Sequence, residues 1–155
     1  MIKSIDFWPR VAAENYKFSD NNIVISITDP SQKLPNICHP YDILRLAFYD
    51  LTQATGESRY DSGLFTEIHA QEIINFLNKY HHTQEEKHLI VHCEAGISRS
   101  ACVALFAHYY TKAQFDKIAS TYASNILIAG ILSNVSGIDV IIPDPTISKG
   151  GILLF

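Results

Sequence analysis

A cysteine and an arginine, with five residues between them, form the stretch of the sequence with the clearest chemical potential. The stretch runs from His92 to Ser100, with a candidate nucleophile at Cys93 and a fixed cation at Arg99. A cysteine thiolate is a strong nucleophile, and the planar guanidinium of an arginine binds phosphate oxygens through paired hydrogen bonds. The pair therefore predicts attack by sulfur on a bound oxyanion.

The segments around this stretch are those that an anion-binding loop requires. Leu89–Val91 is an apolar run typical of a buried strand, and Ala101–Tyr110 is typical of a helix. A tight turn between them directs backbone N–H groups inward, and the helix dipole favours negative charge there, including a thiolate at Cys93. The predicted substrate-binding residues of this phosphate loop (P-loop) are Glu94, Ala95, Gly96, Ile97, Ser98 and Arg99.

This loop resembles the signature of the cysteine-dependent protein tyrosine and dual-specificity phosphatases. The match consists of His92-Cys93, five residues, Arg99 and Ser100, with Gly96 where the family has a glycine. The resemblance implies a phosphomonoesterase that forms and then hydrolyses a phosphocysteine at Cys93. It also implies that Ser100 donates to the sulfur and that His92 orients the loop. The chain looks like a compact, stand-alone, dual-specificity-like enzyme of the kind predicted in bacteria.

The reaction needs a general acid to protonate the leaving oxygen, and aspartates in loops are the candidates. In the family that the chain resembles, the acid lies on a mobile loop that follows a strand and precedes a long helix. Asp50 fits, because it follows the strand expected at 44–49. Asp61 competes with it, since Asp61 is closer to Cys93 along the chain in an equally polar loop. Asp42 precedes the strand and is expected at the opposite edge.

Strand-like and helix-like segments alternate along the chain. Strands are expected at 2–7, 23–27, 44–49 and 88–91, and helices at 10–14, 101–110, 112–122 and 125–132. A further, long helix is expected to run to about residue 80, with Ser62 or Thr66 as its N-cap. The alternation favours a single α/β domain over residues 1–155, with a central, largely parallel sheet flanked by helices on both faces. The resemblance adds that this fold is dual-specificity-phosphatase-like. Ligands bind beyond the carboxyl ends of such strands, so Asp50 and Cys93 should share one edge.

Two further segments carry weaker expectations. Residues 51–61 are polar and contain a glycine, which predicts an exposed loop. The tail, residues 136–155, has one candidate edge strand at 140–142.

Composition and charge narrow the class of protein. The 47% hydrophobic and 18% charged content is typical of a globular domain, and the net charge of −4 argues against nucleic acid and a polybasic membrane anchor. The N-terminal residues lack the apolar core of a signal peptide, and no apolar stretch is long enough to span a bilayer. Three cysteines, an odd number, fit a reducing cytoplasm. The oligomeric state stays open.

The lining of the loop indicates the substrate. Glu94 and Ile97 are not basic, whereas members of the resembled family that act on inositol lipids often have lysine or arginine at these positions. We therefore expect a phosphorylated protein or peptide, with phosphotyrosine and phosphoserine/threonine both open, and no cofactor or metal. A phosphate-binding interaction module without turnover is one alternative. Sulfur transfer or arsenate reduction is another, with Cys38 and Cys102 as weak candidates for a resolving thiol.

Overall fold

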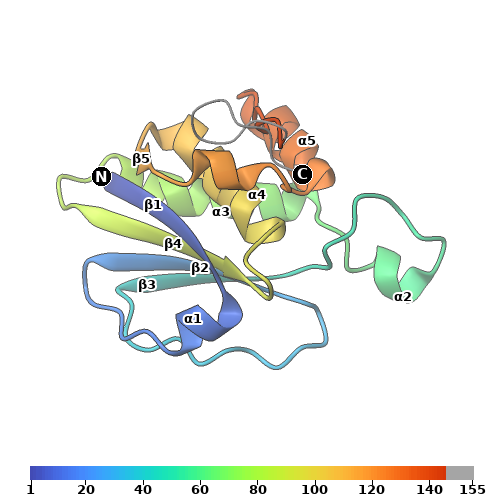
Figure 1. Cartoon of the computed structure of the whole chain (residues 1–155), viewed down its shortest axis with the longest axis horizontal. Coiled ribbons are helices and arrows are strands. Elements are labelled where there is room, and N and C mark those ends of the chain that lie inside the picture. The colour runs from blue at the N-terminus through green and yellow to red at the C-terminus, as the bar shows by residue number, and fades with distance from the viewer. Residues whose placement is uncertain (146–155) are drawn as a thin grey trace.

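The computed structural model describes residues 1–145, which contain a five-stranded sheet in the order β3-β2-β4-β1-β5 (Figure 1). Every strand pairing in it is parallel. The strands are β1 (Ile2–Pro9), β2 (Asn22–Thr28), β3 (Asp42–Ala47), β4 (Lys87–Cys93) and β5 (Gln114–Phe115). The predicted α/β class with a parallel central sheet is therefore confirmed.

Helices lie on both faces of the sheet, as predicted, but they cover the two faces unevenly. The helices are α1 (Arg10–Glu14), α2 (Ser58–Asp61), α3 (Glu67–His81), α4 (Arg99–Thr111), the 3-10 helix η1 (Ile118–Thr121) and α5 (Ile126–Ser136). Figure 1 shows α3, α4 and α5 over one face, whereas α1 and loops lie on the other. Within the described residues, no helix is both long and apolar enough to cross a membrane.

The alternation of side chains along β2 explains why both faces are covered. Ile23, Ile25 and Ile27 join the main core beneath the long helices. Val24 points to the other face, where it packs in a smaller cluster with Phe18 and Ile90. All of these side chains are buried, as expected for a central strand of a parallel sheet.

The helix predicted at 112–122 does not form as such, although the short 3-10 helix η1 lies within this range. Helix α4 ends at Thr111, and the residue that caps it, Lys112, adopts a left-handed backbone conformation with φ of 63°. The following residues, Gln114 and Phe115, pair instead with β1 as the short edge strand β5, and Phe115 is buried against the core. Pairing with a distant strand thus outweighs the local helical propensity of this segment.

Two weaker expectations also change. No strand forms at 140–142, where Val140 and Ile142 instead pack as half-buried side chains against the main core. The rest of the tail, residues 146–155, lies outside the described residues. The segment 51–61 is largely exposed, as predicted, but it includes the four-residue helix α2, which projects away from the sheet (Figure 1).

The parallel arrangement brings the carboxyl ends of four strands to one edge. β1 and β4 end together, with Pro9 opposite Cys93. β2 and β3 also end together, with Thr28 opposite Ala47. Asp50 follows the end of β3, so it lies at the same edge as Cys93.

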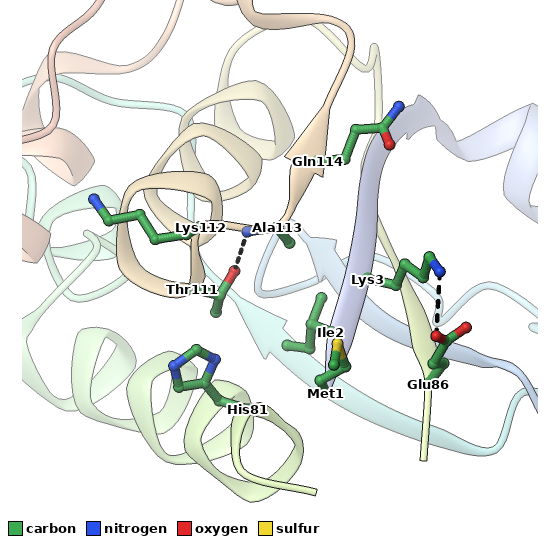
Figure 2. Close-up of a pocket in the computed structure, with 9 residues that line it drawn as sticks. All are labelled: Met1, Ile2, Lys3, His81, Glu86, Thr111, Lys112, Ala113 and Gln114. Atoms are coloured by element: carbon green, nitrogen blue, oxygen red, sulfur yellow. Dashed lines mark hydrogen bonds and ion pairs between the residues drawn. The ribbon is translucent and has the colours of Figure 1, made fainter. Parts of the chain in front are cut away.

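The opposite, amino-terminal edge holds a cleft of about 410 Å³ (Figure 2). Its lining residues are Met1, Ile2, Lys3, His81, Glu86, Thr111, Lys112, Ala113 and Gln114. Asp42 begins β3 at this edge, as expected, and accepts a hydrogen bond from Lys79 at 2.8 Å. None of the predicted site residues lines this cleft, so it is separate from the loop that follows Cys93.

Candidate active site

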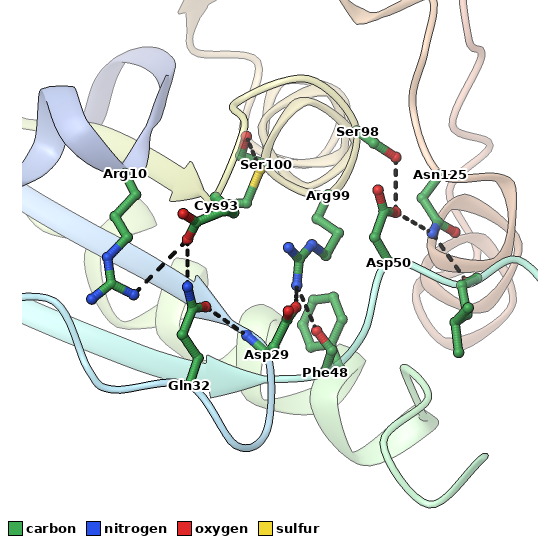
Figure 3. Close-up of polar contacts among 12 residues, drawn as sticks. Arg10, Asp29, Gln32, Phe48, Asp50, Cys93, Ser98, Arg99, Ser100 and Asn125 are labelled. Carbon is green, nitrogen blue, oxygen red and sulfur yellow. Dashed lines mark hydrogen bonds and ion pairs between the residues drawn. The ribbon is translucent and has the colours of Figure 1, made fainter. Parts of the chain in front are cut away.

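The loop between β4 and α4 surrounds the sulfur of Cys93, which is 2% exposed. The hydroxyl oxygen of Ser100 lies 3.0 Å from the sulfur, and Figure 3 shows the two side chains facing each other. The backbone N–H of Gly96 donates to the same sulfur at 3.3 Å. Both contacts can stabilise negative charge on the sulfur, which suits a thiolate that attacks and later departs.

Glycine at position 96 is a structural requirement of this loop. Its φ of 67° lies in the left-handed region, and an added Cβ would lie 2.4 Å from the backbone nitrogen of Pro9. The loop is therefore seated directly on the end of β1. The next residue, Arg10, donates its backbone N–H to the carbonyl of Glu94 at 3.1 Å, which fixes the start of the loop as well.

Arg99 is buried, and one edge of its guanidinium is held by the protein. Its Nη1 donates to the carboxylate of Asp29 at 2.7 Å and to the carbonyl of Phe48 at 2.8 Å (Figure 3). Its Nε, in contrast, is buried and has no hydrogen-bond partner in the described part of the chain. A buried donor without a partner is costly, so this N–H is well suited to a bound anion.

Asp29 is a site residue that sequence reasoning missed. Its carboxylate forms an ion pair with Arg99, so it holds the guanidinium in place. The sequence contained a signal for this residue, because Asp29 directly follows the buried strand β2, just as Asp50 lies shortly after the end of β3. Gln32, also missed, accepts from the Asp29 backbone at 3.2 Å and donates to Glu94 at 2.6 Å. The turn after β2 thereby contacts both Arg99 and the rim of the loop.

The structure brings Asp50 to the candidate loop. One carboxylate oxygen of Asp50, Oδ1, accepts from the hydroxyl of Ser98 at 2.9 Å and from the side-chain amide of Asn125 at 2.8 Å. In Figure 3, Asp50 lies between Asn125 and the guanidinium of Arg99. The carboxyl group of Asp50 is thereby bonded to the loop that follows Cys93 and to the residue before α5.

Asp61 is engaged elsewhere. Its Oδ1 accepts from the backbone N–H of Thr55 at 2.7 Å and from the Thr55 hydroxyl at 2.9 Å, while Oδ2 accepts from Gly56 at 3.0 Å. These hydrogen bonds lower the pKa of Asp61, and the bond from the Thr55 backbone contributes most. All three of these bonds to the carboxylate of Asp61 therefore come from its own loop.

His92 lies behind the nucleophile rather than beside the substrate position. It is fully buried, and its Nδ1 lies 3.3 Å from the carbonyl of Cys93, which can only accept. The opposite ring nitrogen, Nε2, lies 2.6 Å from the hydroxyl of Ser26 and can accept from it. Burial lowers the pKa of His92, so the neutral ring is favoured. This arrangement can orient the start of the loop.

The other cysteines show no sign of taking part in the site. Cys38, Cys93 and Cys102 are all free thiols. Burial raises the pKa of Cys102, which keeps it a protonated thiol within α4. Among residues 1–145, no group of histidine, cysteine and carboxylate side chains is arranged to hold a metal ion.

Cys93 thus lies at the base of a loop at the carboxyl edge of a parallel sheet, next to a buried arginine whose Nε has no partner in the described part of the chain. Residues 64–127 match the family model described as Protein-tyrosine phosphatase, and this range includes the whole loop. Over this range the chain is similar to the cysteine-dependent protein tyrosine phosphatases, and the match does not distinguish the dual-specificity-like branch. Comparisons with curated proteins and with solved structures gave no match. The match to the family model supports phosphatase activity in general.

Proposed function

We propose that the protein is a dual-specificity-like phosphatase that hydrolyses phosphate monoesters on tyrosine, or on serine and threonine, in proteins or peptides. The observation that carries this proposal is the convergence of three groups on one loop. The sulfur of Cys93 lies at its base, the unpartnered Nε of Arg99 is buried beside it, and Asp50 is bonded to it through Ser98. The proposed nucleophile, anion donor and acid thus all belong to this loop or are bonded directly to it.

In the proposed first step, the Cys93 thiolate attacks the phosphorus of the bound monoester. A sulfur–phosphorus bond forms as the bond to the leaving oxygen breaks, and Asp50 donates its proton to that oxygen. The backbone N–H groups of residues 94–99 and the guanidinium of Arg99 stabilise the charge on the equatorial oxygens. Asp29 contributes indirectly, because its ion pair holds Arg99 in position.

In the proposed second step, water hydrolyses the phosphocysteine. Asp50, now ionised, accepts a proton from the water as the new oxygen–phosphorus bond forms. The sulfur–phosphorus bond breaks, and sulfur departs as the thiolate. Ser100, 3.0 Å from the sulfur, stabilises this leaving group by hydrogen bonding.

The rim of the loop supports a singly phosphorylated, protein-like substrate. Ile97 is 56% exposed and apolar, and the exposed carboxylate of Glu94 is bonded to Gln32. Neither side chain adds positive charge for a second phosphate. The net charge of −4 and the free thiols support two further parts of the proposal, namely no nucleic-acid partner and a cytoplasmic location.

A phosphate-binding module without turnover is less well supported. It needs only the loop and Arg99, whereas here Ser100 also contacts the sulfur and Asp50 contacts the loop. Turnover of p-nitrophenyl phosphate by the purified protein separates the two readings. Binding of phosphate or a phosphopeptide without any turnover would favour the module.

Asp50→Asn should lower kcat/KM for phenyl phosphate by about a hundredfold or more, because a general acid typically supplies that much. The loss with p-nitrophenyl phosphate should be much smaller, since nitrophenolate leaves readily without a proton. The alkaline limb of the pH profile, which reports loss of the acid's proton, should flatten. The measurement is kcat/KM for both substrates across the pH range.

Asp61→Asn is the matched control, because it removes the competing carboxylate in the neighbouring loop. We expect it to retain the wild-type preference between the two substrates. A wild-type pH profile in Asp50→Asn, or the substrate-dependent loss in Asp61→Asn instead, would exclude Asp50 as the acid.

A further inference from the structure

We infer that Asn125 is a positioning residue for the proposed general acid, an inference that rests on the proposed function of Asp50. Asn125 is 2% exposed and lies just before α5. Its Nδ2 donates to Oδ1 of Asp50 at 2.8 Å and to the carbonyl of Leu51 at 3.1 Å (Figure 3). One buried amide therefore holds both the side chain of the acid and the backbone that follows it.

The other end of the same amide is fixed by α5. Its Oδ1 accepts from the backbone N–H groups of Leu127 at 2.9 Å and Ile128 at 3.1 Å, which makes Asn125 the N-cap of the helix. Because these donors require the oxygen on their side, the amide nitrogen must face Asp50. The backbone N–H of Asn125 also donates to the carbonyl of Ser98 at 3.4 Å. The start of α5 thus joins the acid to the phosphate loop.

This arrangement determines which oxygen of the acid carries the proton. Oδ1 of Asp50 already accepts from both Asn125 and Ser98, so protonating it would disrupt two hydrogen bonds. The proton to be transferred therefore resides on Oδ2. Two donors on Oδ1 also stop the carboxyl group from rotating, which keeps Oδ2 directed at one place. Asn125 acts on the reaction only through this orientation of Asp50.

Two substitutions separate this role from the capping role. Asn125→Asp keeps an oxygen that can cap α5, where negative charge is favourable, but replaces the donor facing Asp50 with a second carboxylate. Asn125→Ser also caps a helix and adds no charge, but a side chain that short cannot reach Asp50 while it caps. Asn134→Asp is the control for charge, because Asn134 is an exposed residue of the same helix.

Both Asn125 variants should lose roughly tenfold to a hundredfold in kcat/KM for phenyl phosphate, the scale expected when a reacting group is misplaced. Both should lose little with p-nitrophenyl phosphate, which needs no proton donor. Asn134→Asp should match the wild type with both substrates.

The inference is overturned if the Asn125 variants match the wild type, or if they lose equally with both substrates, as a general disturbance of the fold would produce. Thermal unfolding shows whether each variant is folded, and Asn125→Ser decides the question if Asn125→Asp is not. If Asp50→Asn loses more activity with phenyl phosphate than with p-nitrophenyl phosphate but the Asn125 variants do not, the role of Asn125 is excluded and the proposed function stands. If Asp50→Asn shows no such difference between the two substrates, Asp50 is not the acid and both proposals fail.

Discussion

Cys93→Ser should reduce turnover of p-nitrophenyl phosphate by roughly 10⁴-fold or more, because loss of a catalytic nucleophile typically has an effect of that size. A serine hydroxyl stays protonated at neutral pH, so the variant has no anionic nucleophile at this position. The side chain of Arg99, the proposed anion donor, is untouched. The measurement is kcat alongside the affinity for phosphate, which should be retained.

Cys38→Ser is the matched control for this substitution. Cys38 is a free, half-buried thiol, and its backbone carbonyl accepts a hydrogen bond from Phe18, remote from the loop in sequence. We expect wild-type activity from it. Activity of Cys93→Ser within tenfold of the wild type would contradict a covalent mechanism at this sulfur.

Arg99→Lys should lower kcat by roughly 10²–10³-fold, the cost of removing one preorganised donor to transition-state charge. It should also weaken substrate binding. A lysine ammonium lacks the planar fork, so it cannot contact Asp29 and Phe48 on one side and the phosphoryl oxygens on the other. The carboxylate of Asp29 would lose the ion pair that it forms at 2.7 Å.

The control for this second prediction is Arg59→Lys, an exposed arginine of α2 whose ion pair with Glu57 lies on the surface. We expect its kcat and KM to equal those of the wild type. Thermal unfolding of Arg99→Lys separates lost chemistry from lost structure. A folded variant with wild-type kcat would show that the guanidinium is not required.

The proposed centre of the site follows from local sequence patterns. Cys93 and Arg99 lie within one strand-loop-helix unit, so their neighbourhood is determined by residues close to them in the chain. Asp50 was predicted almost as directly, because the end of a parallel strand places a residue at the same edge as the loop. The choice between Asp50 and Asp61 needed coordinates, since it depends on the bonds from Thr55 to Asp61.

The missed residues act through contacts between segments far apart in the chain. Asp29 meets Arg99 across 70 positions, and Asn125 meets Asp50 across 75. No local hydrophobic period encodes such pairs, because the folded sheet edge creates them. The wrong helix at 112–122 has the same origin, since the pairing of Phe115 with Ile5 converts a helix-like sequence into an edge strand.

The proposed mechanism passes through a covalent phosphate on Cys93, and this intermediate can be trapped in Asp50→Asn. With p-nitrophenyl phosphate the first step needs no acid, whereas the second step still lacks its base, so the intermediate should accumulate. We expect mass spectrometry of the acid-quenched variant to find a phosphoryl group on the peptide that contains Cys93. Continued release of nitrophenol with Cys93 unmodified, or with the phosphoryl group on another residue, would contradict the proposed mechanism.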